Sequence, residues 1–113
     1  MNSKLEQTLA RFRLSFADEL NVKLALVVKY WSEVKTAKSM VAIRQFRFEI
    51  HSLRGSSGTL GFSILSKKLG IIEEKVVSYE EQINNLESTI TFIEPDINSI
   101  IEASKINPNP LLE

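Results

Sequence analysis

The chain has no cysteine among its 113 residues, which excludes disulfide bonds, thiol catalysis and cysteine-ligated zinc. Its 14 basic and 14 acidic side chains balance, so no overall charge draws it to nucleic acid or to an anionic membrane surface. It lacks an apolar run of about 18 residues that could span a membrane, and its N-terminus does not have the layout of a secretory signal. These absences predict a cytoplasmic protein that neither binds nucleic acid nor inserts into a membrane.

Glycine and proline are also scarce, with four and three residues, and every glycine lies between positions 55 and 70. A β-rich fold needs more turns than these residues provide, whereas apolar residues recur at helical spacing along most of the chain. We therefore expect an all-α fold. The length suits a single domain, which we place at residues 1–106, and two prolines after it predict a flexible tail at 107–113.

Five helical segments follow from the capping signals and the apolar spacing. A short first helix begins at Ser3 with a capping-box pattern, and a helix of about five turns begins at Ser15. Ser39 is the expected cap of the third helix, which ends at Gly61, and Ser63 is the expected cap of the fourth. Four long amphipathic helices with short connections predict an antiparallel up-down four-helix bundle, with an additional short N-terminal helix across one end.

Two boundaries near the end of the chain stay open. The fourth and fifth helices separate either at Ser78, which forms a capping-box pattern with Glu81, or near Asn84-Asn85. Pro95 lies opposite the apolar stripe of the last helix. It either kinks this helix on the solvent side or marks the first turn of a new helix.

The single histidine, His51, lies in the third predicted helix, about a third of a turn from the centre of its apolar stripe. At 100° per residue, its strip of surface also carries Arg44, Arg47, Arg54, Gly55 and Gly58. A glycine inside a helix costs roughly 1 kcal/mol relative to alanine. Glycines kept at such positions indicate that bare backbone is needed there.

This strip suits a nucleophile that accepts phosphate. A neutral imidazole can attack phosphorus, and arginines disfavour a further positive charge on the ring and can pair with phosphoryl oxygens, Arg54 from one turn away. Gly55 and Gly58 leave room for a second protein to approach the helix. Each feature also has an ordinary explanation as solvated surface, helix end or helix packing. Their position on one strip favours the functional interpretation.

The stretch FEIHSLRGSSGTLGF at 48–62, with the residues at 65, 69, 72 and 73, closely resembles the histidine-containing phosphotransfer (HPt) domain of bacterial two-component phosphorelays. That family has the phosphorylated histidine, a hydrophobic residue two positions later, lysine or arginine followed by glycine, and a further glycine. The matching residues are His51, Leu53, Arg54, Gly55 and Gly61. Lysine is the commoner residue at the place of Arg54, which keeps the charge but alters the geometry of a phosphate contact.

The resemblance implies a phosphorelay intermediate in signal transduction. His51 would accept a phosphoryl group from an aspartate of a receiver domain and pass it to another receiver, with Arg54 contacting the group. Glu73 matches a position that often hydrogen-bonds the unphosphorylated ring nitrogen; alternatively, it is an acidic residue on a solvated face beside Glu74. The expected partner-binding residues are Arg44, Arg47, Gly55 and Gly58.

The implied partners are response-regulator receiver domains and a hybrid sensor histidine kinase. The sequence has no Walker-type glycine loop and no acidic cluster typical of a magnesium site. We therefore expect a phosphohistidine carrier without ATP binding, kinase activity, cofactor or metal, with magnesium on the partner receiver. Two alternatives stay open: the phosphoacceptor module of a chemotaxis-type histidine kinase, which the sequence at 58–62 also suits, and a helical interaction module that is not phosphorylated.

Overall fold

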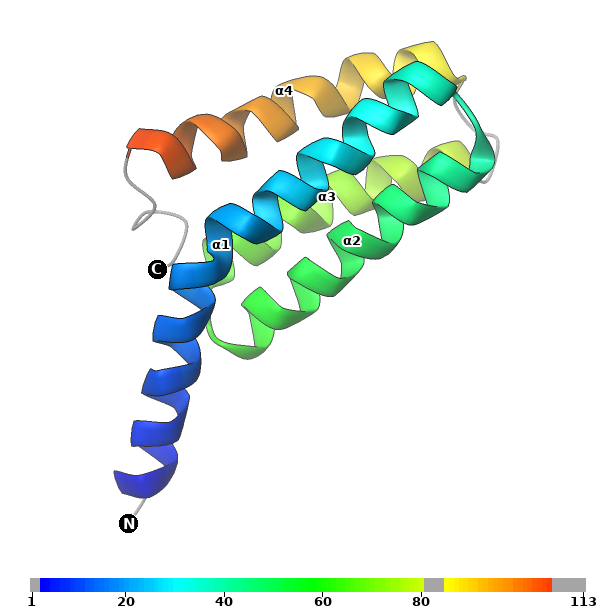
Figure 1. Cartoon of the computed structure of the whole chain (residues 1–113). Coiled ribbons are helices and arrows are strands. Elements are labelled where there is room, and N and C mark those ends of the chain that lie inside the picture. Colours follow the sequence, from blue (N-terminus) through cyan, green and yellow to red (C-terminus); the bar gives the residue numbers. More distant parts are fainter. Residues whose placement is uncertain (1–2, 81–84, 107–113) are drawn as a thin grey trace.

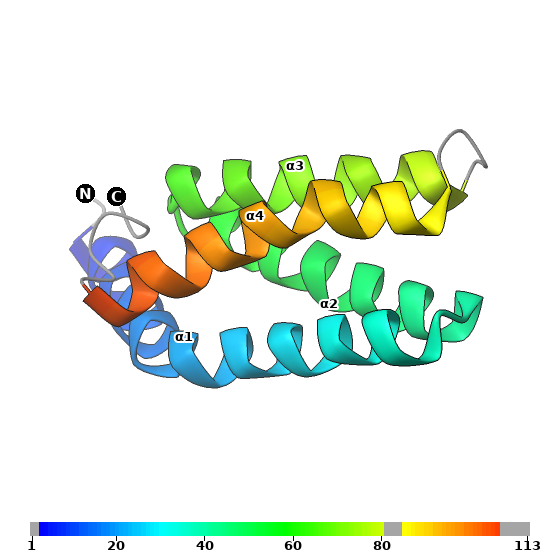
Figure 2. The same cartoon turned by 90° about the horizontal axis from the view of Figure 1, so that it is seen from above.

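The computed structural model describes residues 3–80 and 85–106. Within them the chain forms four helices: α1 (Ser3–Ala37), α2 (Met40–Thr59), α3 (Ser63–Glu80) and α4 (Leu86–Ile106). Consecutive helices run in opposite directions and lie side by side (Figures 1 and 2). The prediction of an all-α four-helix bundle is confirmed, whereas the predicted tail at 107–113 lies outside the described residues.

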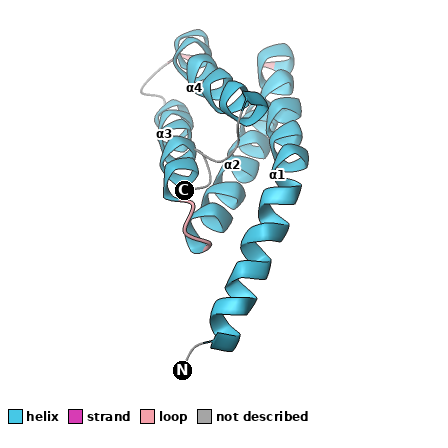
Figure 3. Ribbon diagram, turned by 90° about the vertical axis from the view of Figure 1, so that its left-hand side faces the viewer, coloured by secondary structure: helices cyan, strands magenta, loops and turns pink. Residues whose placement is uncertain are grey.

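The additional N-terminal helix is not a separate element, because residues 3–37 form the single helix α1. This part of the sequence has no glycine or proline, and Ser15 is helical because a serine inside a helix costs only a few tenths of a kcal/mol. Residues 3–15 do not lie across the end of the bundle. They project beyond it, and all of them are exposed (Figures 1 and 3).

The two ends of α2 follow the predicted signals. The Ser39 hydroxyl accepts a hydrogen bond from the backbone N–H of Ala42 at 3.2 Å and caps the helix. After the last turn, Gly61 has a φ of +85°, and the backbone N–H of Phe62 bonds to the carbonyl of Ser57 at 2.8 Å. This is a Schellman motif, in which a glycine takes the left-handed position, and it turns the chain directly into α3.

The connection between α3 and α4 shows which of the two predicted helix boundaries is correct. Ser78 lies inside α3, so a break there is wrong. The side chain of Asn85 accepts a hydrogen bond from the backbone N–H of Ser88 at 2.8 Å, which makes Asn85 the cap of α4 and confirms the boundary near Asn84-Asn85. Pro95 lies inside α4, on its exposed side, so no new helix begins there. On that side solvent can hydrogen-bond the carbonyl that proline leaves unpaired.

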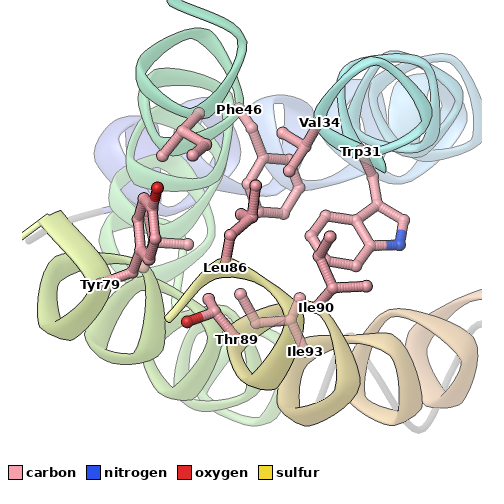
Figure 4. Close-up of a pocket in the computed structure, with 10 residues that line it drawn as sticks. Trp31, Val34, Phe46, Tyr79, Leu86, Thr89, Ile90 and Ile93 are labelled. Carbon is pink, nitrogen blue, oxygen red and sulfur yellow. The ribbon is translucent and has the colours of Figure 1, made fainter. Parts of the chain in front are cut away.

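The core between the four helices is closed. Figure 4 shows its end near Trp31, where side chains from all four helices converge around a cavity of only about 10 Å³. The rings of Trp31 and Phe46 pack with their centroids 5.1 Å apart, and the Trp31 indole donates a hydrogen bond to Glu94 at 2.6 Å. Such a cavity holds one water molecule at most, so this part of the core has no room for a ligand.

Candidate functional site

His51 lies on the exposed side of α2. Its chain neighbour Ile50 and the nearby Leu53 are buried in the core and fix the rotation of the helix about its axis. The imidazole consequently points away from the core, and 71% of the side chain is exposed. A reagent or a second protein can therefore reach the ring from solvent.

One carboxylate of α3 connects His51 to Arg54. Oε2 of Glu73 lies 2.7 Å from Nδ1 of His51, and Oε1 of Glu73 accepts a hydrogen bond from Nη1 of Arg54 at 2.9 Å. Only 12% of the Glu73 side chain is exposed, whereas Glu74 beside it faces solvent. Glu73 is thus not part of a solvated acidic face, and it holds two side chains of α2 in place.

The Glu73 contact determines which ring nitrogen is free. Burial acts to raise the pKa of Glu73, but the hydrogen bonds from Arg54 and His51 and their charges outweigh it, and the pKa is below the usual value of 4.5. An ionised carboxylate can only accept hydrogen bonds, so Nδ1 of His51 carries the proton that is shared with Glu73. In the neutral ring, Nε2 then keeps its lone pair.

Gly70 of α3 also belongs to the site, although the helical spacing around His51 does not predict it. A β-carbon at this buried position would lie 3.1 Å from Cζ and 3.2 Å from Nε of Arg54. The guanidinium of Arg54 therefore crosses α3 directly over the bare backbone of Gly70 on its way to Glu73. The sequence feature that could have indicated this contact is a glycine inside a predicted helix, because Gly70 lies three residues before Glu73.

The other two arginines of the strip differ in their surroundings. Nε of Arg47 forms an ion pair with Oε1 of Glu80 on α3 at 3.0 Å, so its charge is partly compensated. Arg44 is exposed, and no ion pair of Arg44 is found among the described residues. An open hollow of about 350 Å³ is lined by Arg44, Arg47, Phe48, His51 and Glu73.

The two glycines of the strip also have different environments. A β-carbon at Gly55 would meet no atom within 4 Å, so this position is open to solvent. At Gly58 the same atom would lie 3.2 Å from Oγ of Ser66, so Gly58 allows α2 and α3 to approach each other. The site therefore joins His51, Arg54, Glu73, Arg44 and Arg47, with Gly55 open beside them and Gly58 in the helix contact.

The described part of the chain contains no group of three or more histidine, cysteine or acidic side chains that could hold a metal ion. None of its helices is long and apolar enough to cross a membrane. Comparison of the sequence and the structure with protein-family models, curated proteins and solved structures finds no match.

Proposed function

We propose that this protein is a phosphohistidine carrier of the HPt type, which takes a phosphoryl group from a receiver-domain aspartate and passes it to another receiver. The observation that carries the proposal is the state of His51. Its ring is 71% exposed, Nδ1 is bound to Glu73, and Nε2 is left as the nucleophile. The sequence resemblance to HPt domains supports the same reading.

The groups at this site account for the bonds and charges that change during phosphoryl transfer. The lone pair of Nε2 forms the P–N bond while the P–O bond to the aspartyl carboxylate of the donor breaks, and the aspartate leaves as a carboxylate. The ring gains a positive charge, which the carboxylate of Glu73 stabilises through Nδ1–H. In the second transfer, an aspartate of the acceptor attacks phosphorus, the P–N bond breaks and the neutral ring returns.

Arg54 shares the Glu73 carboxylate with His51, and we expect it to contact the phosphoryl group after transfer. In the unphosphorylated protein its guanidinium is shared with Glu73, and 44% of the side chain is exposed. A guanidinium binds phosphoryl oxygens with two parallel hydrogen bonds, whereas a carboxylate and a phosphoryl group repel each other. Phosphorylation of Nε2 would therefore draw part of the Arg54 contact from Glu73 to the phosphoryl oxygens.

The exposed face of α2 suits docking of a receiver domain. Phe48 is exposed and lines the same hollow as His51, Arg44 adds a positive charge, and Gly55 leaves the backbone open. An exposed aromatic residue within a basic rim is typical of a protein contact with an acidic partner. In this proposal the partners are receiver domains and a hybrid sensor histidine kinase in the cytoplasm, and they supply ATP and magnesium.

The test is transfer from a defined donor. The protein is incubated with a receiver domain phosphorylated by acetyl phosphate and, separately, with an ATP-loaded histidine-kinase domain, with His51→Gln as the matched control. Acid-labile, base-stable phosphate on the wild-type protein from the receiver arm alone supports the carrier. Labelling by the kinase domain alone assigns the protein to chemotaxis-type phosphoacceptor modules, and no label in either arm leaves a helical interaction module.

A further inference from the structure

The projecting segment of α1, residues 3–15, carries an apolar stripe without a partner among the described residues. The stripe consists of Leu5, Leu9 and Phe12, which are 57%, 42% and 57% exposed. Their spacing of four and three residues continues to Phe16, which is buried in the bundle. The stripe that faces the core further along α1 therefore continues into solvent for about 20 Å.

A helix with this pattern is typical of one that packs against another helix. A segment of 13 residues gains little stability from helix propensity, and most helical stability in proteins comes from burial of an apolar face. Beside it lies an open groove of about 530 Å³, lined by residues of α1 and α2 that include Phe12, Gly55, Thr59 and Leu60. The stripe and this groove together form a surface against which a helix running along residues 3–15 can pack.

The charges that flank the stripe fit a second copy of the same segment. Glu6 and Arg13 lie on one flank of the stripe, whereas Lys4 and Arg11 lie towards the other side of the helix, away from the contact. If two copies run antiparallel with Leu9 of each against Phe12 of the other, Glu6 of each copy lies opposite Arg13 of the other. Cζ of Arg13 lies 4.9 Å from the ring centroid of Phe62, and this contact holds the Arg13 side chain on this flank.

The geometry points to a homodimer in which residues 3–15 of two copies pair antiparallel, through the stripe Leu5, Leu9 and Phe12 and two symmetric Glu6–Arg13 ion pairs. In a parallel pair the two-fold axis would run along the helices, so Glu6 and Arg13 of the two copies would lie on opposite sides of the contact and would not pair. Two such short helices bury less than about 1,200 Å², so the dimer is weak and dissociates on dilution. This inference does not depend on the proposed phosphotransfer.

Sedimentation equilibrium of the full chain from about 1 µM to about 1 mM tests the dimer. The average mass should rise with concentration from the monomer value of 12.8 kDa towards twice that value. Leu9→Gln should weaken the association about tenfold, because the contact contains Leu9 twice. The matched control is Leu14→Gln, since Leu14 is 68% exposed on the opposite face of the same segment and should leave the association unchanged. A wild-type protein that stays monomeric throughout this range overturns the inference.

The orientation is tested by charge exchange between two variants. Glu6→Arg and Arg13→Glu should each associate about tenfold more weakly than wild type, because like charges then face each other. An equimolar mixture of the two variants should recover the association, since both cross pairs become opposite in charge. If both single variants associate as wild type does, or if the mixture stays monomeric, the antiparallel pairing is wrong. Circular dichroism of each variant shows that α1 remains folded.

Discussion

The contact between Arg54 and Gly70 predicts that Gly70→Ala will separate stability from phosphotransfer. The new β-carbon would lie 3.1 Å from Cζ of Arg54, which is tighter than nine in ten real contacts of a β-carbon. Because the atoms it meets belong to a flexible side chain, Arg54 should move, and α3 should stay in place. The substitution therefore acts on the arginine that holds Glu73.

The two effects on stability nearly cancel. Alanine is favoured over glycine inside a helix by about 1 kcal/mol. The ion pair between Arg54 and Glu73 is worth about 0.5–1 kcal/mol, because Arg54 is 44% exposed and solvent screens it. We expect the free energy of unfolding to change by less than about 1 kcal/mol in either direction, measured by urea denaturation.

Phosphate acceptance should fall much more. Displacement of the guanidinium weakens a charge-assisted contact to the phosphoryl group worth about 1.4 kcal/mol, and the initial rate of transfer from a labelled receiver should fall about tenfold. Gly55→Ala is the matched control for the stability effect alone, because its β-carbon meets nothing within 4 Å, so it should stabilise α2 by about 1 kcal/mol. In the Arg54→Ala background, Gly70→Ala should have no further effect on the rate. An unchanged rate for Gly70→Ala in the wild-type background would refute the role given to this contact.

Four further predictions concern His51 and the residues around it. His51→Gln should abolish phosphate acceptance and leave the thermal midpoint nearly unchanged, since the ring is mostly exposed; a large loss of stability would mean that His51 is structural. Gly55→Leu should weaken receiver binding, measured by calorimetry, because a bulky side chain fills the open position, and unaltered binding would place the docking surface elsewhere. Arg44→Gln should lower the receiver association rate and its salt dependence more than Arg47→Gln does, because Arg47 is already paired with Glu80 of α3. Equal effects of the two substitutions in stopped-flow kinetics would contradict this reasoning. The pKa of Glu73 is lowered in the folded protein, so the stability that this carboxylate contributes is fully present above pH 4.5 and is lost as the pH falls through the folded value. Glu73→Gln should therefore make acid unfolding less steep. An identical pH profile would show that the contact adds no stability.

Much of the fold followed from short-range signals. The cap at Ser39 and the left-handed turn at Gly61 were predictable because they depend on residues within one or two turns of each other. The same kind of signal failed at Ser15 and Ser78, which lie inside α1 and α3. A serine stops a helix only where the chain also leaves it, and nothing in these two segments breaks the helical backbone.

The site shows where prediction from the sequence ends and packing begins. Helical spacing was enough to place Arg54 near His51, because both belong to one helix. The approach of Arg54 to Gly70 depends instead on how closely α2 and α3 pack, and the sequence does not give this distance. Gly58 lies against Ser66 in the same interface, so the close approach that brings Glu73 to His51 relies on small residues on both helices. A larger residue at Gly58 should therefore separate the helices and lengthen the contact between Glu73 and Nδ1 of His51, although it touches neither residue.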